Sequence, residues 1–387
     1  MILLVTIVCM TGIILIAPTL PEIRIALGVS EEDIGLIIAA YTFPAAFLAP
    51  LFGSLADQYG RREIIVPNLI LFGVAGTLCA YAKTFLVFVI LRAFQGVGLA
   101  GMMPLLPVLI GDLFEGQRQV EAMGAEFITT NMTVALLTPA AGLLAAYSWR
   151  LPLFFYILTV PLAITIFLKL DTPKPKRILG LSLNYMTTIL RLLCKRGVVA
   201  AFLMGITRPI LLYGPYLTYL TLWVVVRFDA SPFVRGLLLS CMQLVGAVSA
   251  SRGRWLDTHV GRKRLPPMGL VLYAIALIAL PFTPSLWGVF LLIALFGAGH
   301  GIILPHIYNY LNEVTPMEHR AGVMSIFNTF FYGGQTLGPL LFGFFFISFG
   351  SFSSVFFVGG LLALLGAFFG ALLFHSGGNV VLSTNLE

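Results

Sequence analysis

Long apolar stretches recur along the whole chain, and short polar segments separate them. A helix needs about 20 mostly apolar residues to cross a lipid bilayer. Unbroken apolar runs indicate such helices, because the strands of a membrane β-barrel alternate apolar and polar positions. Twelve stretches are long enough, and the pattern places them at residues 2–20, 34–56, 64–81, 84–109, 120–145, 151–169, 196–222, 232–254, 267–283, 286–310, 321–348 and 352–374.

The longest polar interruption divides these predicted spans six and six. It runs from Asp171 to Arg196 and contains two prolines and six Lys or Arg residues. We therefore expect an N-terminal six-helix bundle, a cytoplasmic linker, a C-terminal six-helix bundle and a cytoplasmic tail. Their boundaries fall at residues 1–170, 171–195, 196–376 and 377–387.

The two halves of the chain repeat one another. The run Gly53–Asp57 at the end of the second span returns as Gly253–Asp257 at the end of the eighth. Pro139 in the fifth span corresponds to Pro339 in the eleventh, at the same offset of 200 residues. A duplicated unit predicts an all-α membrane protein whose two six-helix bundles are related by pseudo-two-fold symmetry, with a site between them near the middle of the membrane.

Composition and charge support this class and suggest an orientation. Only 10% of the residues are charged and 59% are hydrophobic, whereas soluble proteins carry about 25% charged residues. A soluble enzyme and a DNA-binding protein are therefore excluded, despite the net charge of +7. With a cytoplasmic N-terminus, the inner loops hold sixteen Lys and Arg residues and the outer loops five. This asymmetry predicts a multi-pass protein of the cell (inner or plasma) membrane with both termini in the cytoplasm.

Three segments resemble motifs of the major facilitator superfamily. Gly53–Arg62 is similar to the family's signature loop between the second and third spans, and Leu91–Gly98 to a motif of proton-coupled members whose arginine is implicated in proton transfer. Thr138–Gly142 resembles the motif associated with antiporters. The resemblance covers essentially the whole chain and is closest to the twelve-span drug/proton antiporters. It implies secondary active transport by alternating access, in which two bundles rock around a central site.

The signature segment has its own physical logic. Asp57 lies at the inner end of the second span, where its carboxylate can face the positively polarised N-terminus of the eleventh. Gly53 allows close helix approach, Gly60 permits a left-handed turn, and Arg61 and Arg62 hold the inner interface. Together with the resemblance, this pattern predicts that the five residues form a conformational latch.

Ionisable side chains at membrane depth are candidates for function by default. Glu126 is the carboxylate that the sequence places well inside a span, and Arg92 approaches the same depth from the preceding span. We expect an Arg92–Glu126 pair that couples transport to protons. Arg208 should share a helix face with Tyr216 and Tyr219, eight and eleven residues further on.

These positions outline a mostly apolar cavity with a few polar groups, suited to a small amphiphilic organic molecule. The polar side chains expected to line it are Gln95, Thr130, Thr133, Arg208, Tyr216, Tyr219, His300, Asn328 and Gln335. We expect the protein to expel such compounds with a proton gradient as the energy source.

Two other functions stay open at this stage. Arg92 and Arg208, one from each bundle, would suit a symporter or exchanger that clamps an organic anion or an anionic lipid. A non-transporting membrane receptor or scaffold is the more remote alternative.

Several other chemistries find no support in the sequence. Gly96–Gly101 matches a dinucleotide-binding pattern, but it lies in an apolar helix with no strand before it. The four cysteines show neither metal-site nor disulfide spacing. We therefore expect no enzymatic activity, no cofactor, no metal and no nucleic acid. The expected partners are a small-molecule substrate, protons and the lipid bilayer, and the expected state is a monomer.

Overall fold

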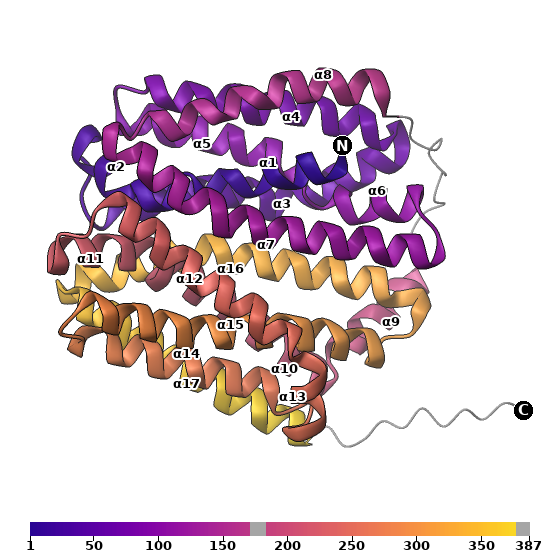
Figure 1. Cartoon of the computed structure of the whole chain (residues 1–387). Coiled ribbons are helices and arrows are strands. Elements are labelled where there is room, and N and C mark those ends of the chain that lie inside the picture. Colours follow the sequence, from indigo (N-terminus) through magenta and orange to yellow (C-terminus); the bar gives the residue numbers. More distant parts are fainter. Residues whose placement is uncertain (171–182, 377–387) are drawn as a thin grey trace, which may run out of the picture.

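The structure, a computed structural model, describes residues 1–170 and 183–376. These residues form helices without any strand, and twelve helical segments are long and apolar enough to cross a membrane. Figure 1 shows two bundles, one from each half of the chain, packed against each other. The predicted twelve spans, their division into six and six, and the all-α class are confirmed.

Several spans consist of more than one helical segment. In the first bundle the segments, span by span, are α1 (Ile2–Ile14), η1 (Ala17–Thr19) and α2 (Leu20–Leu27); η2 (Asp33–Gly35) and α3 (Leu36–Tyr59); α4 (Arg61–Leu78) and η3 (Cys79–Tyr81); α5 (Phe85–Ala100) and α6 (Leu105–Leu113); α7 (Gly116–Tyr147); η4 (Leu151–Leu158) and α8 (Thr159–Lys169). In the second bundle they are α10 (Arg196–Leu211), the π-helix η5 (Leu212–Leu220) and α11 (Thr221–Phe228); α12 (Pro232–Ser251) and α13 (Gly253–His259); α14 (Leu265–Ala279) and η6 (Leu280–Phe282); α15 (Leu286–Val314); η7 (Met317–His319) and α16 (Arg320–Phe349); α17 (Phe352–Ser376).

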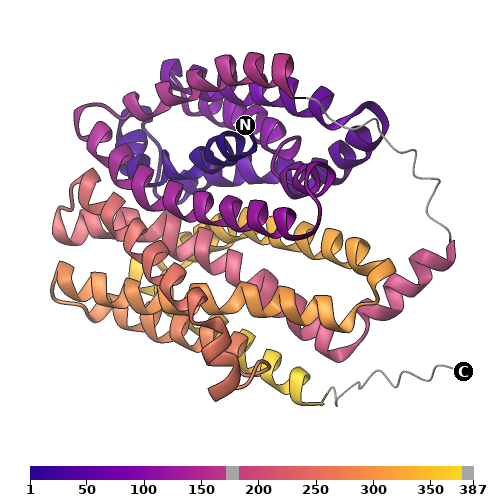
Figure 2. The same cartoon turned by 45° about the vertical axis from the view of Figure 1, so that its right-hand side comes forward.

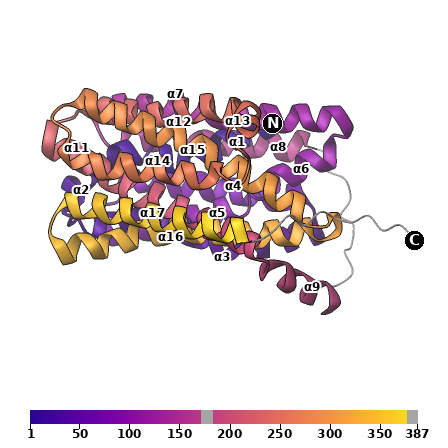
Figure 3. The same cartoon turned by 90° about the horizontal axis from the view of Figure 1, so that it is seen from below.

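One helix lies outside both bundles. α9 (Leu183–Leu193) falls within the predicted linker, and Figure 3 shows it beside the bundles rather than among the spans. It packs against α10 and α16 and buries Ile189 and Leu192. Residues 171–182 and the predicted tail at 377–387 lie outside the described residues, so the exact domain boundaries stay predictions.

Glycines let α5 lie close against two neighbouring helices. A Cβ atom on Gly96 would stand 2.1 Å from the carbonyl oxygen of Tyr41 in α3. One on Gly98 would stand 2.7 Å from the carbonyl oxygen of Asn68 in α4. Because any side chain there would push the helices apart, the glycine pattern of this segment is explained by helix packing.

Two helix pairs form most of the interface between the bundles: α7 packs along α12, and α3 packs along α16 (Figures 1 and 2). Met1 and the last turn of α17 lie toward one end of the molecule, together with α9 (Figure 1). We call this the terminal end. The opposite end carries the short connections at residues 28–32 and 229–231.

Candidate functional site

An arginine-centred charge cluster lies at the terminal end of the first bundle. Arg61 Nη1 is 2.5 Å from Asp57, and Arg61 Nε is 3.2 Å from Asp112. The cluster therefore ties the end of α3 to the end of α6. The turn between α3 and α4 is made at Gly60, whose φ of 112° is a conformation that glycine adopts freely. The positive φ agrees with the choice of glycine at this turn, but with ψ at 150° the residue lies outside the left-handed helical region that the sequence suggested.

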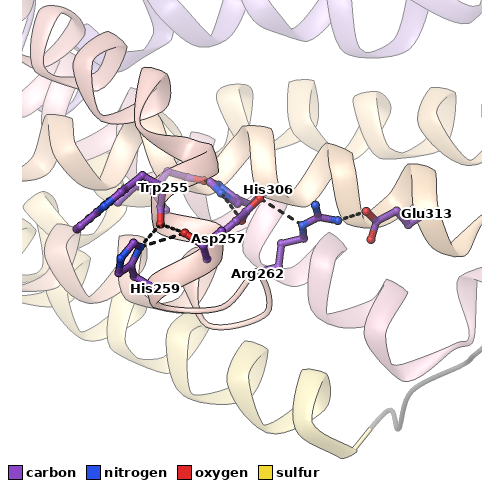
Figure 4. A network of polar contacts seen from close by, with 8 residues as sticks. Trp255, Asp257, His259, Arg262, His306 and Glu313 are labelled. Carbon is purple, nitrogen blue, oxygen red and sulfur yellow. Dashed lines mark hydrogen bonds and ion pairs between the residues drawn. The ribbon is translucent and has the colours of Figure 1, made fainter.

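The second bundle carries a matching cluster at the same end (Figure 4). Arg262 pairs with Glu313 and, at 3.3 Å, with Asp257, whose other oxygen lies 3.0 Å from His306 Nε2. The Glu313 carboxylate, with a smaller contribution from Asp257, raises the pKa of Arg262. Each member of the arginine–acid triad follows its counterpart in the first bundle by 200 or 201 residues. The internal repeat thus extends to ion pairs that bridge spans.

The predicted latch does not reach the second bundle in this conformation. Among the described residues, Asp57 forms its ion pair within its own bundle rather than with α16. A Cβ atom on Gly53 would meet no atom within 4 Å, so Gly53 is not at the close helix approach that the sequence suggested. Arg62 donates to the carbonyl of Leu170, 3.4 Å away, and so ties α4 to the end of the sixth span.

At the opposite end a buried ion pair joins the bundles. Arg235 in α12 pairs with Glu22 in α2; the Arg235 side chain is fully buried and that of Glu22 is 29% exposed. The charge count from the sequence included Arg235 among the five outer-loop residues, although the predicted span 232–254 contains it. Ser231 caps α12 and Pro232 begins it, so Arg235 falls in the first turn of the helix and the loop assignment is wrong. The Ser-Pro pair is the helix-start signal at this position.

Backbone contacts accompany this ion pair. A Cβ atom on Gly236 of α12 would stand 2.6 Å from the carbonyl oxygen of Thr138 in α7, and one on Gly35 would stand 3.0 Å from the carbonyl oxygen of Pro339 in α16. The two bundles therefore meet directly along both helix pairs at the opposite end.

Polar side chains continue the interface toward the middle of the molecule. Thr42 and Thr336 hydroxyls are 2.9 Å apart, and Gln243 Nε2 donates to Asn131 Oδ1 at 2.8 Å. Gly35, Thr42 and Gly53 are spaced to share one face of the second span. The first touches α16 and the second bonds to it, whereas the third meets nothing. The helices α3 and α16 therefore diverge toward the terminal end.

Arg92 is enclosed within the first bundle. Its side chain is fully buried, and its nitrogens donate to Gln95 Oε1 at 2.5 Å, to the Gly12 carbonyl at 2.8 Å and to the Ile37 carbonyl at 3.4 Å. The guanidinium also lies 4.2 Å from the centre of the Tyr41 ring. Arg92 thus joins α1, α3 and α5 through uncharged partners.

The predicted Arg92–Glu126 ion pair is not formed. Glu126 is half-buried in α7 beside α1, and it accepts a hydrogen bond from Thr130 at 3.4 Å. The pairing prediction used the similar depth of the two residues on consecutive spans. Instead, Arg92 donates to carbonyl groups of α1 and α3. The predicted shared face of Glu126, Thr130 and Thr133 agrees with the Thr130 bond, and Thr133 is buried.

A second buried arginine lies in the other bundle. Arg208 in α10 is 5% exposed, and its Nη2 is 2.7 Å from His300 Nε2 in α15. His300 Nδ1 is in turn 2.8 Å from the hydroxyl of Tyr273 in α14. The structure therefore brings together the two predicted site residues Arg208 and His300. It adds Tyr273, which no motif or spacing in the sequence singles out.

Tyr216 and Tyr219 do not join Arg208, contrary to the prediction. Tyr216 stacks on Phe296 and donates to the Leu239 carbonyl at 3.2 Å, while Tyr219 stacks on Phe346. The π-helix η5, in which hydrogen bonds run from residue i to i+5, begins four residues after Arg208. Both tyrosines lie within it, so the regular α-helical spacing that the prediction assumed does not apply to them.

Two further predicted cavity residues, Asn328 and Gln335, lie on α16, the main helix of the eleventh span. Asn328 Oδ1 accepts a hydrogen bond from Tyr308 of α15 at 2.9 Å, and Gln335 is buried. Their role in a substrate cavity stays a prediction, as does that of Gln95.

Two known proteins of similar sequence are an exporter and a resistance protein. The bacillibactin exporter of Bacillus subtilis (strain 168) is 26% identical over 85% of this chain and 84% of its own length. The quinolone resistance protein NorA of Staphylococcus aureus is 25% identical over 86% of this chain and 85% of its own.

The fold has a close counterpart among solved structures, and a family model covers the chain. A bacterial homologue of the human lysosomal transporter Spinster, in an inward-facing and occupied conformation, has a TM-score of 0.79. It is 16% identical, and the match covers 97% of this chain and 95% of that one. The family model of the Major Facilitator Superfamily matches residues 2–258 and again 228–378. The chain therefore belongs to the Major Facilitator Superfamily of multi-pass membrane transporters, which are not enzymes.

Proposed function

We propose that the protein is a secondary active transporter that expels small amphiphilic organic compounds by alternating access. The supporting observation is the distribution of contacts between the bundles. Described side-chain bonds join them from Glu22–Arg235 to Asn131–Gln243, at the opposite end and in the middle. The charge clusters at the terminal end hold each bundle separately. Such a molecule can rock about its centre, and the names of the two relatives favour export as the direction.

Proton antiport is the energy source that we propose, with Glu126 as the proton carrier. Glu126 is a half-buried carboxylate on α7, the helix that packs along α12 of the other bundle. No described cation pairs with it, so its protonation state is free to respond to substrate or to rocking. We propose that Arg92, which is buried within the first bundle, also takes part in proton coupling. The Arg92–Arg208 clamp gains no support, because all three nitrogens of Arg92 are engaged there.

Purified protein in liposomes with an imposed pH gradient tests the proposal. A panel of cationic, neutral and anionic amphiphiles should include compounds that move against their own gradient, opposite to the proton flow. A protonophore should stop that accumulation. Transport that is indifferent to the gradient and to the protonophore would exclude proton antiport.

Both termini face the cytoplasm in this proposal, so the terminal end opens to the cell interior. Native Cys194, next to α10 at that end, is exposed, whereas Cys9 and Cys79 are buried and Cys241 is half-buried. In a Cys241→Ser background, a membrane-impermeant maleimide should label Cys194 in inside-out vesicles and leave it unlabelled in intact cells. Labelling from the outside of intact cells would reverse the topology.

We also propose that Asp57 acts as a latch in the alternative state, where the terminal end closes on α16. Its interaction with the helix N-terminus is worth about 0.3–2 kcal/mol, which shifts a balanced equilibrium severalfold. Asp57→Asn should therefore change the distance distribution between spin labels on the two bundles while substrate binding persists. Loss of binding with unchanged distances would instead make Asp57 a binding residue.

A further inference from the structure

We propose that Arg208, with His300 and Tyr273, forms an anion site in the second bundle, and that the exported compounds carry an oxyanion, such as a carboxylate, which binds there. This inference rests on the proposed export function and narrows its substrate class. The proposed site uses a single arginine of the second bundle, whereas the clamp considered from the sequence used both Arg92 and Arg208.

Among the described side chains of its own bundle, Arg208 pairs with no acid. The acids of the second half of the chain are Asp229, Asp257, Glu313, Glu318 and Glu387. Asp229 follows α11, and Asp257 and Glu313 belong to the Arg262 cluster. Glu313 is thirteen residues beyond His300 on α15, which is about 20 Å along a helix. The nearest acids in sequence therefore lie far from Arg208.

Its neighbours do not neutralise it either. Arginine carries only hydrogen-bond donors, so His300 Nε2, 2.7 Å from Arg208 Nη2, must act as an acceptor without a proton. With Nε2 as the acceptor, the proton of a neutral imidazole lies on Nδ1, which is 2.8 Å from the Tyr273 hydroxyl and 3.3 Å from the same Arg208 Nη2. His300 thus orients the guanidinium and adds no negative charge.

Donor capacity also remains unused at this arginine. The Nε atom of Arg208 is buried and has no hydrogen-bond partner. A buried charge without a counter-charge is costly unless another group compensates it. Arg92 offers the contrast, because carbonyls, an amide and an aromatic face satisfy each of its nitrogens. Of the two buried arginines near the centre, Arg208 is the one that lacks compensation.

The surroundings of Arg208 suit an aromatic or otherwise amphiphilic acid. The Phe331 ring of α16 lies 5.7 Å from the guanidinium. The half-buried Tyr308 and Asn328 form a hydrogen-bonded pair between α15 and α16. An oxyanion bound to Arg208 would therefore have apolar ring surface and amide and phenol groups beside it.

A matched pair of fluorescent probes that differ in charge tests the site. Dansylglycine carries a carboxylate and dansylglycinamide does not. Full-length protein in nanodiscs of phosphatidylcholine should bind the acid at least tenfold more tightly than the amide. Arg208→Gln should abolish this preference and Arg208→Lys should retain part of it. Arg227→Gln, at an exposed arginine of α11, is the matched control and should leave the preference unchanged.

The inference would be overturned by equal binding of the two probes, by a preference that survives Arg208→Gln, or by a preference lost equally in Arg227→Gln. Phosphatidylglycerol in the nanodiscs that displaces dansylglycine from Arg208 would assign the site to a lipid headgroup and would also overturn it. Binding is measured without a gradient, so the outcome is separate from the export proposal. A charge preference without gradient-driven transport would refute antiport alone, and gradient-driven export of neutral compounds alone would refute the anion site alone.

Discussion

Glu126→Gln is expected to abolish proton-driven accumulation of substrate while downhill exchange continues. Glutamine keeps the size of the side chain and its ability to accept the Thr130 hydrogen bond, but it cannot release or take up a proton. A carrier that cannot titrate has no means of linking substrate movement to the pH gradient. Accumulation in liposomes under an imposed gradient should fall to the level of empty vesicles.

Glu121→Gln supplies the matched control. Glu121 lies on the same helix five residues earlier and is exposed, so its replacement should leave accumulation intact. The wild type should also bind substrate with a pH dependence that weakens in Glu126→Gln. Full accumulation by Glu126→Gln would place the proton carrier elsewhere, with His300 and Asp33 as the next residues to replace.

Breaking the Glu22–Arg235 pair is expected to favour the state in which the opposite end is open. The pair joins α2 to α12 across the two bundles, so any separation of the bundles at that end must break it. In Glu22→Gln the guanidinium of Arg235 lacks its counter-charge. This is unfavourable only while the opposite end is closed and the guanidinium stays buried. A buried donor left without its partner costs about 1–3 kcal/mol, and a charged group costs more. A cost of about 1–3 kcal/mol already corresponds to a shift of roughly five- to 150-fold in the equilibrium between states.

Distances between spin labels on the two bundles at the opposite end report this shift. Glu22→Gln should populate the longer distance, and adding Arg235→Met should restore much of the short one because no buried charge remains. Glu31→Gln is the control, since it breaks the Arg24–Glu31 pair at the same end but within one bundle. An effect of Glu31→Gln as large as that of Glu22→Gln would argue against a gate at this ion pair.

The sequence was informative where a local rule decides the structure. Bilayer thickness sets the length of a span, so the apolar pattern located all twelve. The turn at Gly60 required a positive φ, and the 200-residue offset anticipated the paired clusters around Arg61 and Arg262. These features depend on neighbouring residues or on the repeat itself.

The partners of buried charges were not accessible in the same way. Arg92 bonds to carbonyls of α1 and α3, and every residue has a carbonyl, so no sequence pattern marks those acceptors. Tyr273 gains its place beside His300 only through the packing of α14 on α15. In the alternating-access mechanism that we propose, the distance between Asp57 and α16 changes with the conformational state, and the same sequence must specify both states.

The π-helix η5 has a consequence for how this family should be compared. Each π turn holds an additional residue relative to an α turn, so the segment Leu212–Leu220 is where an insertion can be absorbed without breaking the span. Each residue of an α-helix turns the chain by about 100°. If a relative lacks one residue in this segment, its helix would be regular there. An alignment that placed the gap elsewhere would pair residues that lie on different faces of the two helices. Alignments and chimaeras should therefore place their gap or junction within Leu212–Leu220, so that Arg208 on one side and Trp223 on the other are each matched to their structural equivalents.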